Sequence, residues 1–474
     1  MSLVKNSALY LFSNIIIKAA SFFLLPLYTH LVSPEDYGFV YVVSSFTNFM
    51  SIFLLFSLQS VISRFYFECH NEREIKIFYS NITTMVFGGS SIIILLLFCF
   101  SNPLASLLAL PVKYLYIALL ISYFSIFYNL ILSLLYVKQD AKKVSYTSIA
   151  LGIIGILVQL FMVLYMEDKT MALTGSMLIN AVLSFVIFVV YSVPYFTRPH
   201  FIKSDLRLYV KYALSQWPSD VCVWLIHASD RLLINKFQGA HDTGIYGMGS
   251  NFSQIPTMLF HSVNKAYSPY VFDTFKKHEE EQYYPYKEIQ KSSYMVISCV
   301  ALLVTMLSLF SGEIVSLLSS RFQEASLIIP LVLVASFVDC VRMIFMYPMA
   351  YKIEYVKIKT IIWILSAIIN LALNLWLIPI YSMYGACIAS IASFTLSCIV
   401  LMFFSNKAIN IPYNYSKLIL IVILSIAVGA FCMIGISWLG FIIKVILGCL
   451  YTYVLLRVNE IDLKKYYGKV FHNK

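Results

Sequence analysis

The sequence predicts an all-α polytopic membrane protein with about fourteen transmembrane helices, because a spanning helix needs roughly 20 apolar residues to cross about 30 Å of hydrocarbon. Of the 474 residues, 60% are hydrophobic and only 12% are charged. The mean hydropathy is +0.81. The apolar residues form long stretches, and the short links between these stretches are basic in alternation. Such a composition offers too little polar surface for a water-soluble fold.

In chain order, the apolar stretches predict spans near residues 8–30, 38–60, 79–101, 114–136, 145–166, 171–193, 210–234, 244–271, 292–311, 326–350, 358–378, 384–404, 418–437 and 440–456. No small-residue cleavage site follows the first stretch, which is of full spanning length, so we expect a membrane helix there rather than a cleaved signal peptide. The nine cysteines lie mostly inside apolar stretches and lack metal-ligand spacing. We therefore expect them to be small hydrophobic side chains, and we expect no metal site.

Lys and Arg residues predict the orientation of the chain, because cytoplasmic loops retain positive charge. If the N-terminus is cytoplasmic, the inner segments hold 25 of the 34 Lys and Arg residues. The outer links hold four, namely Lys113, Lys169, Lys236 and Arg321. This asymmetry predicts that both termini are cytoplasmic and that the number of spans is even. The net charge of +11 is then a topology signal and does not indicate a nucleic-acid partner.

Several motifs that would indicate an enzyme are absent from the sequence. It has no Gly-x-x-x-x-Gly-Lys-Ser/Thr run for nucleotide phosphates, no His-Glu-x-x-His and no Gly-x-Ser-x-Gly. The outer links are too short to form a catalytic domain. We therefore expect a secondary transporter that uses no nucleotide and no cofactor.

An internal repeat is visible when the sequence is shifted by 206 residues, which aligns LVSPEDYGFVYVVSSF with FQGAHDTGIYGMGSNF. Asp36 then aligns with Asp242, and Gly38 aligns with Gly244. In each copy we expect the Asp to cap a new helix and the Gly to relax its entry turn. The shift equals six spans, so the two copies have the same orientation and are related by an axis along the membrane normal.

The repeat predicts two pseudo-symmetric six-helix lobes followed by a helix pair. We place the N-terminal lobe at 1–200, the C-terminal lobe at 201–410, and the last two helices with a cytoplasmic tail at 411–474. The sixth and twelfth spans agree with this division, because both open with a glycine (Gly175 and Gly385).

Three segments carry a resemblance to a known family: the opening NSALYLFSNIIIKAASFFLLPLYTHLVSPEDYGFVYVVSSF, the middle ASDRLLINKFQGAHDTGIYGMGSNFSQ, and the basic link before the fifth span. Here the chain resembles polysaccharide (O-antigen-type) flippases of the multidrug/oligosaccharidyl-lipid/polysaccharide exporter superfamily. The resemblance implies a bacterial inner-membrane protein with two six-helix lobes around a central cavity. Such proteins translocate undecaprenyl-diphosphate-linked oligosaccharide repeat units to the outer leaflet by alternating access. It also implies membrane lipids, a polysaccharide polymerase and a chain-length regulator as partners.

Two other function classes stay open. One is an ion-coupled multidrug or small-molecule exporter of the same superfamily, and the other is a membrane polysaccharide polymerase or ligase. Five basic residues lie within the predicted spans against three acidic ones, which favours an anionic cargo. A polymerase or ligase is expected to carry a sizeable outer loop, which this sequence lacks.

Cations within the spans are the first candidates for substrate binding, because an intramembrane charge is by default functional. Lys18 lies in the middle of the first span, too deep for easy snorkelling, although a structural ion pair is the alternative. Lys265 lies nearer the inner end of the eighth span, where snorkelling competes with a binding role. Lys444 lies one turn into the last span and is expected to snorkel outward.

Further candidates for substrate binding are Asp230 and Arg231, which match the family's Asp-Arg element, and the amide of Asn251. Intramembrane amides also bind neighbouring helices together, which is the alternative for Asn251. Adjacent helix positions point about 100° apart, so Asp230 and Arg231 are not expected to pair only with each other.

Two acidic residues suggest coupling or structural roles. Asp220 and His227 lie seven residues apart on roughly one face of the seventh span, so they could couple an ion or make a hydrogen bond between helices. Asp339 and Arg342 stand at i, i+3 on the tenth span and are expected to form a neutralised structural ion pair.

Two prolines predict where the first and eighth spans could bend. Pro26 follows Lys18 by eight residues, about 12 Å along a helix, and Pro256 precedes Lys265 by nine. Each removes a backbone hydrogen bond and can act as a hinge or fix a static kink.

Overall fold

The structure of the protein, a computed structural model, describes residues 3–281, 286–434 and 437–459. Within these ranges every regular element is a helix, as the sequence predicts. Contacts between helices divide the chain into two compact units, Met1–Gly244 and Ile245–Lys474. The division into lobes at 1–200, 201–410 and 411–474 remains a prediction.

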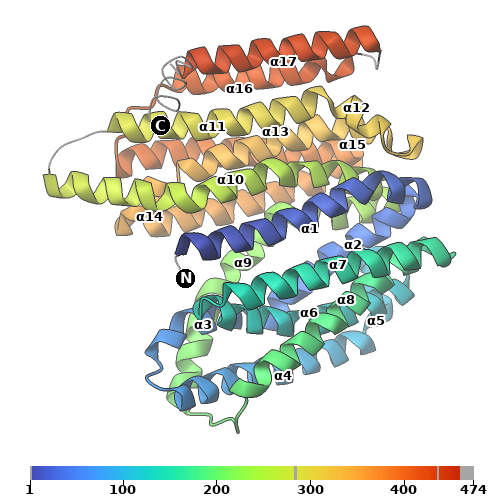
Figure 1. Ribbon diagram of the computed structural model, residues 1–474, viewed down its shortest axis with the longest axis vertical. Helices are drawn as coiled ribbons and strands as arrows, with labels where there is room; N and C mark the ends of the chain where they lie inside the picture. Colours follow the sequence, from blue (N-terminus) through green and yellow to red (C-terminus); the bar gives the residue numbers. More distant parts are fainter. Residues whose placement is uncertain (1–2, 282–285, 435–436, 460–474) are drawn as a thin grey trace, which may run out of the picture. The chain divides into compact units, whose positions relative to one another are not determined.

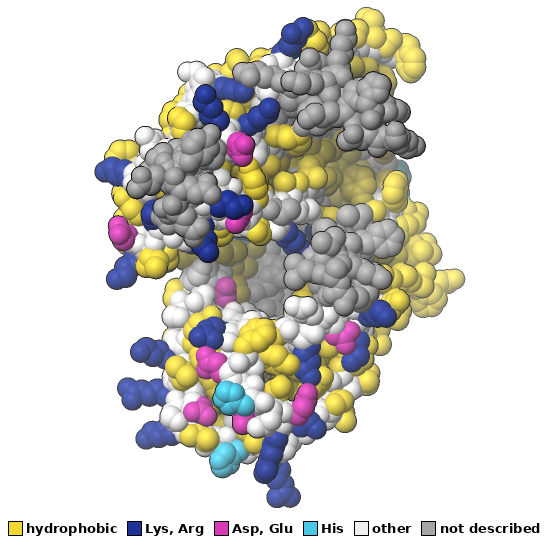
Figure 2. All heavy atoms as spheres, turned by 60° about the vertical axis from the view of Figure 1, so that its left-hand side comes forward, with side chains coloured by type: hydrophobic (Ala, Val, Ile, Leu, Met, Phe, Trp, Pro, Cys, Tyr) yellow, Lys and Arg dark blue, Asp and Glu magenta, His cyan; other side chains and the backbone are white. Residues whose placement is uncertain are grey.

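The first unit contains nine α-helices together with the first turn of α10 (Figure 1). They are α1 (Leu3–Leu31), α2 (Pro34–Leu55), α3 (Leu58–Phe65), α4 (Glu72–Cys99), α5 (Ser101–Leu108), α6 (Val112–Val137), α7 (Ala141–Tyr165), α8 (Lys169–Ser192) and α9 (Lys203–Gln238). Helix α6 packs against α2, α4 and α8, so it forms the centre of this unit. Figure 2 shows many Lys and Arg side chains on one face of the first unit.

The second unit contains most of α10 (Ala240–Glu281) and the helices that follow it. They are α11 (Tyr286–Leu309), α12 (Ser311–Ser316), α13 (Ala325–Ile344), α14 (Tyr347–Tyr351), α15 (Ile353–Ala408), α16 (Tyr415–Gly429) and α17 (Trp438–Val458). Helix α13 packs against α11, α12 and α15, while α16 and α17 both pack against α11. Short 3-10 helices occur at η1 (Tyr66–Glu68), η2 (Val193–Tyr195), η3 (Ser320–Phe322) and η4 (Ala430–Met433).

Ten helices are long and apolar enough to cross a membrane: α2, α4, α6, α7, α8, α11, α13, α15, α16 and α17, with α8 and α16 counted together with the short turns that follow them. The 56-residue α15 covers two predicted spans, because Ser382 turns the chain with φ 50° and ψ −135°. Helices α1, α9 and α10 cover the first, seventh and eighth predicted spans. Counting the two arms of α15 separately, a helix corresponds to each of the fourteen predicted ranges.

The two units share a detail at the ends of α4 and α11. Phe100 and Phe310 each precede a short helix, α5 or α12, whose first residue is a buried serine. The hydroxyl of Ser101 lies 3.2 Å from that of Tyr116, fifteen residues later. The hydroxyl of Ser311 donates to the carbonyl oxygen of Ser326, also fifteen residues later, at 3.0 Å. The structure therefore confirms two pseudo-symmetric sets of helices.

In the first unit, the connector after α8 is strapped to α4. Asn81 on α4 makes two hydrogen bonds with the backbone of His200, at 2.7 Å and 2.9 Å. The Ser80 hydroxyl accepts the backbone N–H of Thr197 at 2.9 Å. These bonds satisfy backbone N–H and C=O groups of the connector, which lies outside any helix and so lacks the hydrogen bonds of a helix.

The second unit contains an equivalent strap from the connector after α15 to α11. Gln290 donates to the carbonyl oxygen of Pro412 at 2.6 Å, and Tyr294 accepts the N–H of Asn414 at 2.6 Å. In both units, therefore, the connector after the sixth helix of the repeat is fixed to the third helix.

One detail of the predicted helix starts is corrected by the structure. Ser33, not Asp36, is the N-cap of α2, and Asp36 closes a capping box from the third helical position. Asp242 likewise lies inside the first turn of α10, which begins at Ala240. A Ser side chain before the first helical residue can accept a backbone N–H more directly than an Asp inside the helix, which is why Ser33 takes the cap.

Candidate functional site

Two long helices, α9 and α10, differ from the others in polarity. They have 36 and 42 residues, enough to cross a membrane. Over its described residues, neither is among the ten helices that are also apolar enough to do so. A helix with polar residues on several sides is poorly suited to face lipid, and charged residues in spans face cavities or other helices. These two helices carry six of the seven predicted binding and coupling residues, including Arg231 and Lys265, and the seventh, Lys18, lies on α1.

Helix α9 lies along α2 with an aromatic seam between them. The ring of Trp224 on α9 is 4.5 Å from that of Phe49 on α2, and its Nε1 donates to the carbonyl oxygen of Ser45 at 3.1 Å. Two turns earlier, Trp217 makes an edge contact with Phe53 at 5.0 Å. Aromatic pairs of this kind fix the two helices in register.

Asp230 and Arg231 lie at this seam. Asp230 is buried, and its carboxylate accepts the backbone N–H of Arg231 at 2.9 Å. The Arg231 guanidinium lies 5.4 Å from the centre of the Tyr41 ring on α2. A cation held over an aromatic face in this way is attracted by the negative face of the ring.

Asp220 lies on α9 two turns before His227. The hydroxyl of Ser57, at the start of α3, donates to the Asp220 carboxylate at 2.6 Å. The His227 ring is exposed. The structure therefore engages Asp220 with α3, and a joint role of Asp220 and His227 in ion coupling stays a proposal.

Lys18 is exposed on α1. The preceding residue, Ile17, packs where a Cβ atom on Gly152 of α7 would lie, so α1 is closely apposed to α7 on that side. Among the described residues, Lys18 has no hydrogen-bond or ion-pair partner. In the second unit Lys265 is also exposed on α10, and the part of the chain that the structure describes offers it no such partner either.

Helix α10 also carries Asn251, whose side-chain oxygen accepts the Gln254 amide at 3.5 Å. Both predicted hinge prolines lie inside continuous helices, Pro26 in α1 and Pro256 in α10. The carbonyl oxygen of Pro26 accepts a hydrogen bond from the Thr29 hydroxyl at 2.9 Å. Whether the two prolines act as hinges stays a proposal.

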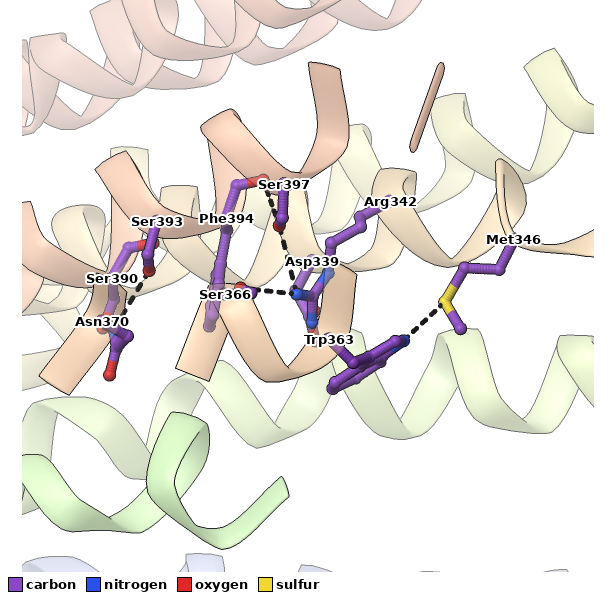
Figure 3. Close-up of polar contacts among 10 residues, drawn as sticks. All are labelled: Asp339, Arg342, Met346, Trp363, Ser366, Asn370, Ser390, Ser393, Phe394 and Ser397. Atoms are coloured by element: carbon purple, nitrogen blue, oxygen red, sulfur yellow. Dashed lines mark hydrogen bonds and ion pairs between the residues drawn. The ribbon is translucent and has the colours of Figure 1, made fainter. Parts of the chain in front are cut away.

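Asp339 and Arg342 form an ion pair inside the second unit, with side chains 4% and 1% exposed (Figure 3). The Arg342 guanidinium lies 4.3 Å from the ring centre of Trp363 and 4.9 Å from that of Phe394. These rings belong to the two arms of α15. The charge of Arg342 is thus compensated by a carboxylate and two aromatic faces.

Serine and asparagine side chains continue this polar cluster along α15. Arg342 donates to the hydroxyls of Ser366 and Ser397, at 3.3 Å and 3.2 Å, and Asn370 donates to Ser393 at 3.1 Å (Figure 3). The sequence reasoning missed Ser366 and Ser397. Their spacing is a usable signal, because Ser366, Asn370 and Asn374 stand at i, i+4 and i+8 and therefore share one helix face.

Lys444 corrects a prediction, because it does not snorkel outward. Its side chain is 0% exposed, and its Nζ lies 2.8 Å from the Glu313 carboxylate of α12. It also donates to the carbonyl oxygen of Cys432 at 3.4 Å. Glu313 was missed as a partner because it stands 131 residues away, just after the ninth predicted span. A buried Lys with a carboxylate in reach is stabilised more by pairing than by stretching toward water.

Comparison with known sequences identifies the family. Residues 27–327 match the family described as polysaccharide biosynthesis protein. The chain belongs to this family. A relative of this polysaccharide biosynthesis protein, an uncharacterised membrane protein of Haemophilus influenzae, is 24% identical over 292 residues, which are 58% of this chain and 67% of that protein.

Solved structures establish the fold of this polysaccharide biosynthesis protein. It is similar to the lipid II flippase MurJ in an inward closed conformation, with a TM-score of 0.71, 14% identity, and coverage of 94% of this chain and 98% of that one. It is also similar to an outward-facing multidrug resistance MATE family transporter of the MOP superfamily, with a TM-score of 0.57, 12% identity, and coverage of 85% and 94%. The predicted multi-pass helical membrane fold is therefore confirmed.

Proposed function

We propose that this protein is a flippase that translocates undecaprenyl-diphosphate-linked oligosaccharide repeat units from the inner to the outer leaflet of a bacterial inner membrane. The family match to polysaccharide biosynthesis and the similarity to a lipid II flippase support this class of cargo. The observation that carries the proposal is the pair of exposed cations, Lys18 and Lys265, which have no hydrogen-bond or ion-pair partner among the residues that the structure describes.

The chemistry of the cargo requires such cations. A pyrophosphate is costly to bring into hydrocarbon unless positive charge and hydrogen bonds replace its water. Lys18 in one repeat and Lys265 in the other would supply charge, while Arg231 over Tyr41 would supply a planar donor set that suits phosphate oxygens. Asn251 and the carboxylate of Asp230 would bind sugar hydroxyls.

The basic inner segments support an orientation with both termini in the cytoplasm. In that orientation the starts of α2 and α10 face the outside, and cargo enters from the cytoplasmic leaflet. A polysaccharide polymerase and a chain-length regulator would act on the exported units.

Complementation tests this proposal. The gene is expressed in flippase-null strains with different surface glycans, and lipid-linked repeat units are located by glycan labelling. Restored surface polymer in at least one strain supports the proposal. Repeat units that stay on the cytoplasmic side in every strain, with the protein present in the membrane, would refute it.

The similarity to MATE transporters favours a second candidate, an ion-coupled exporter of small molecules. The same strains distinguish the two, since loss of an exporter changes sensitivity to toxic compounds and leaves the surface glycan intact.

A further inference from the structure

The N-terminal ends of α2 and α10 meet inside the first unit at two glycines. A Cβ atom on Gly38 of α2 would lie 1.8 Å from the carbonyl oxygen of Ala240, and one on Gly244 of α10 would lie 1.9 Å from the carbonyl oxygen of Pro34. No side chain fits at such distances, so any residue larger than glycine would push the two helix ends apart. Each glycine is therefore a notch for the backbone of the other helix.

The two notches are related by the internal repeat. Ala240 lies 206 residues after Pro34, and Gly244 lies 206 residues after Gly38. Exchanging the two segments thus converts the first contact into the second. Reciprocal contacts of this kind are the mark of a two-fold axis. The aligned Asp-x-Gly segments therefore meet each other in space.

A histidine lies beside the notches. The Nε2 atom of His241 on α10 is 4.0 Å from Oε1 of Glu35 on α2, and its Nδ1 is 3.4 Å from Oδ1 of Asp242. A protonated ring attracts both carboxylates, and a neutral ring attracts them far less. Histidine gains or loses its charge between about pH 5 and pH 8.

Other charged groups on the neighbouring helices have partners of their own. Asp36, the next residue on α2, accepts the Thr170 hydroxyl of α8 at 2.7 Å. Lys236, near the end of α9, donates to the carbonyl oxygen of Ser106 at 3.3 Å. The start of α2 is thus bonded to α8 and the end of α9 to α5, while the His241 and Glu35 side chains stay partly exposed.

We propose that the starts of α2 and α10 form a proton-operated latch, in which protonated His241 holds the two helix starts together at Gly38 and Gly244. Neutral His241 weakens the latch and lets the first turn of α10 separate from α2. Helix α10 is continuous from Ala240 to Glu281, so the latch determines whether the first turn of this long helix stays in contact with α2. On the orientation proposed above, the latch senses the pH outside the membrane, whatever the cargo.

Hydrogen–deuterium exchange of the purified protein tests the proton dependence. Exchange of the peptide covering the start of α10 is measured at about pH 5.5 and pH 7.5 for wild type and His241→Gln, and the two proteins are compared at each pH so that the intrinsic exchange rate cancels. We expect the variant to exchange about two- to fivefold faster at the lower pH, the range for partly exposed ion pairs. We expect equal exchange at the higher pH. A difference that is the same at both values, or absent at both, would overturn the latch.

Glycine variants test the notches separately. Gly38→Ala and Gly244→Ala should each speed exchange of this peptide by about tenfold or more, as expected for an overpacked contact. Gly88→Ala on α4 is the matched control, because no atom lies within 4 Å of a Cβ placed there. If this peptide exchanged at the wild-type rate in Gly38→Ala, the proposed close packing of the two helix starts at the glycines would be refuted. If that variant does not accumulate, Glu35→Gln must reproduce the loss of pH dependence seen with His241→Gln. The readout is independent of export, so this test and the complementation test can fail separately.

Discussion

Replacing Asp339 by Asn should destabilise the protein more than replacing Arg342 by Met. Both substitutions break a buried ion pair, but they leave different groups behind. Asp339→Asn leaves a guanidinium that stays protonated at any physiological pH. Arg342→Met leaves a carboxylate, which can take up a proton, and puts an apolar side chain between Trp363 and Phe394.

The magnitudes follow from the burial of the pair. Its side chains are 1% and 4% exposed, so little water can compensate a lone charge. Removing one partner of such a pair costs about 3 to 5 kcal/mol, which we expect for Asp339→Asn. A neutralised but unsatisfied carboxyl group costs about 1 to 3 kcal/mol, which we expect for Arg342→Met. The double variant should be more stable than Asp339→Asn alone, because no lone charge remains.

Reversible unfolding in lipid bicelles, followed by circular dichroism, measures these free energies. A matched control is Ser390→Ala, which removes a buried hydroxyl from the arm of α15 that carries Phe394 without removing a contact of the pair. The reasoning would be refuted if Arg342→Met were the more destabilising single change. It would equally be refuted if the double variant lost the sum of the two single effects.

The other predictions concern export, attachment of the last helices, bending and orientation. Lys18→Ala should abolish export while the protein stays in the membrane, and Lys18→Arg should retain more activity than Lys18→Gln, because a pyrophosphate needs positive charge. Glycan labelling checks this, and equal activity of the Arg and Gln variants would contradict it. Lys444→Met should lower stability by about 1 to 3 kcal/mol and make the last helix pair easier to cleave with protease, whereas Lys444→Arg should not. The double variant Pro26→Ala and Pro256→Ala should slow export without loss of folding if the prolines are hinges, and export at the normal rate would exclude that role. A cysteine at Lys277 should resist an impermeant reagent in intact cells, and labelling from outside would overturn the fourteen-span topology.

The sequence predicted the helices well because apolar length alone specifies a span. It also predicted the repeat from Asp36, Gly38 and their partners 206 residues later. The reciprocal contact of Gly38 and Gly244 gives that alignment a physical cause, since only glycine fits where the two backbones touch. The sequence could not reveal that the aligned segments contact each other, because alignment carries no distance.

Pairings over long distances were the main failure. Lys444 looked solitary in an apolar stretch, and the carboxylate of Glu313 lay outside any predicted span. Likewise, the two arms of α15 supply Trp363 and Phe394 to Arg342 only because Ser382 turns the chain back. Such contacts depend on how helices pack, and hydropathy is blind to packing.

The strap between Asn81 and His200 has a consequence for biosynthesis. A chain that emerges from the ribosome with its N-terminus first presents α4 long before its partner exists. The side chain of Asn81 cannot complete its two bonds until residue 200 has been synthesised. The strap of the second unit is delayed in the same way, because Gln290 on α11 bonds to Pro412, which is synthesised much later. In each half of the protein, therefore, the strap can form only after the segment that follows the sixth helix has left the ribosome. A nascent chain truncated just before either connector would leave the third helix of that half without its strap.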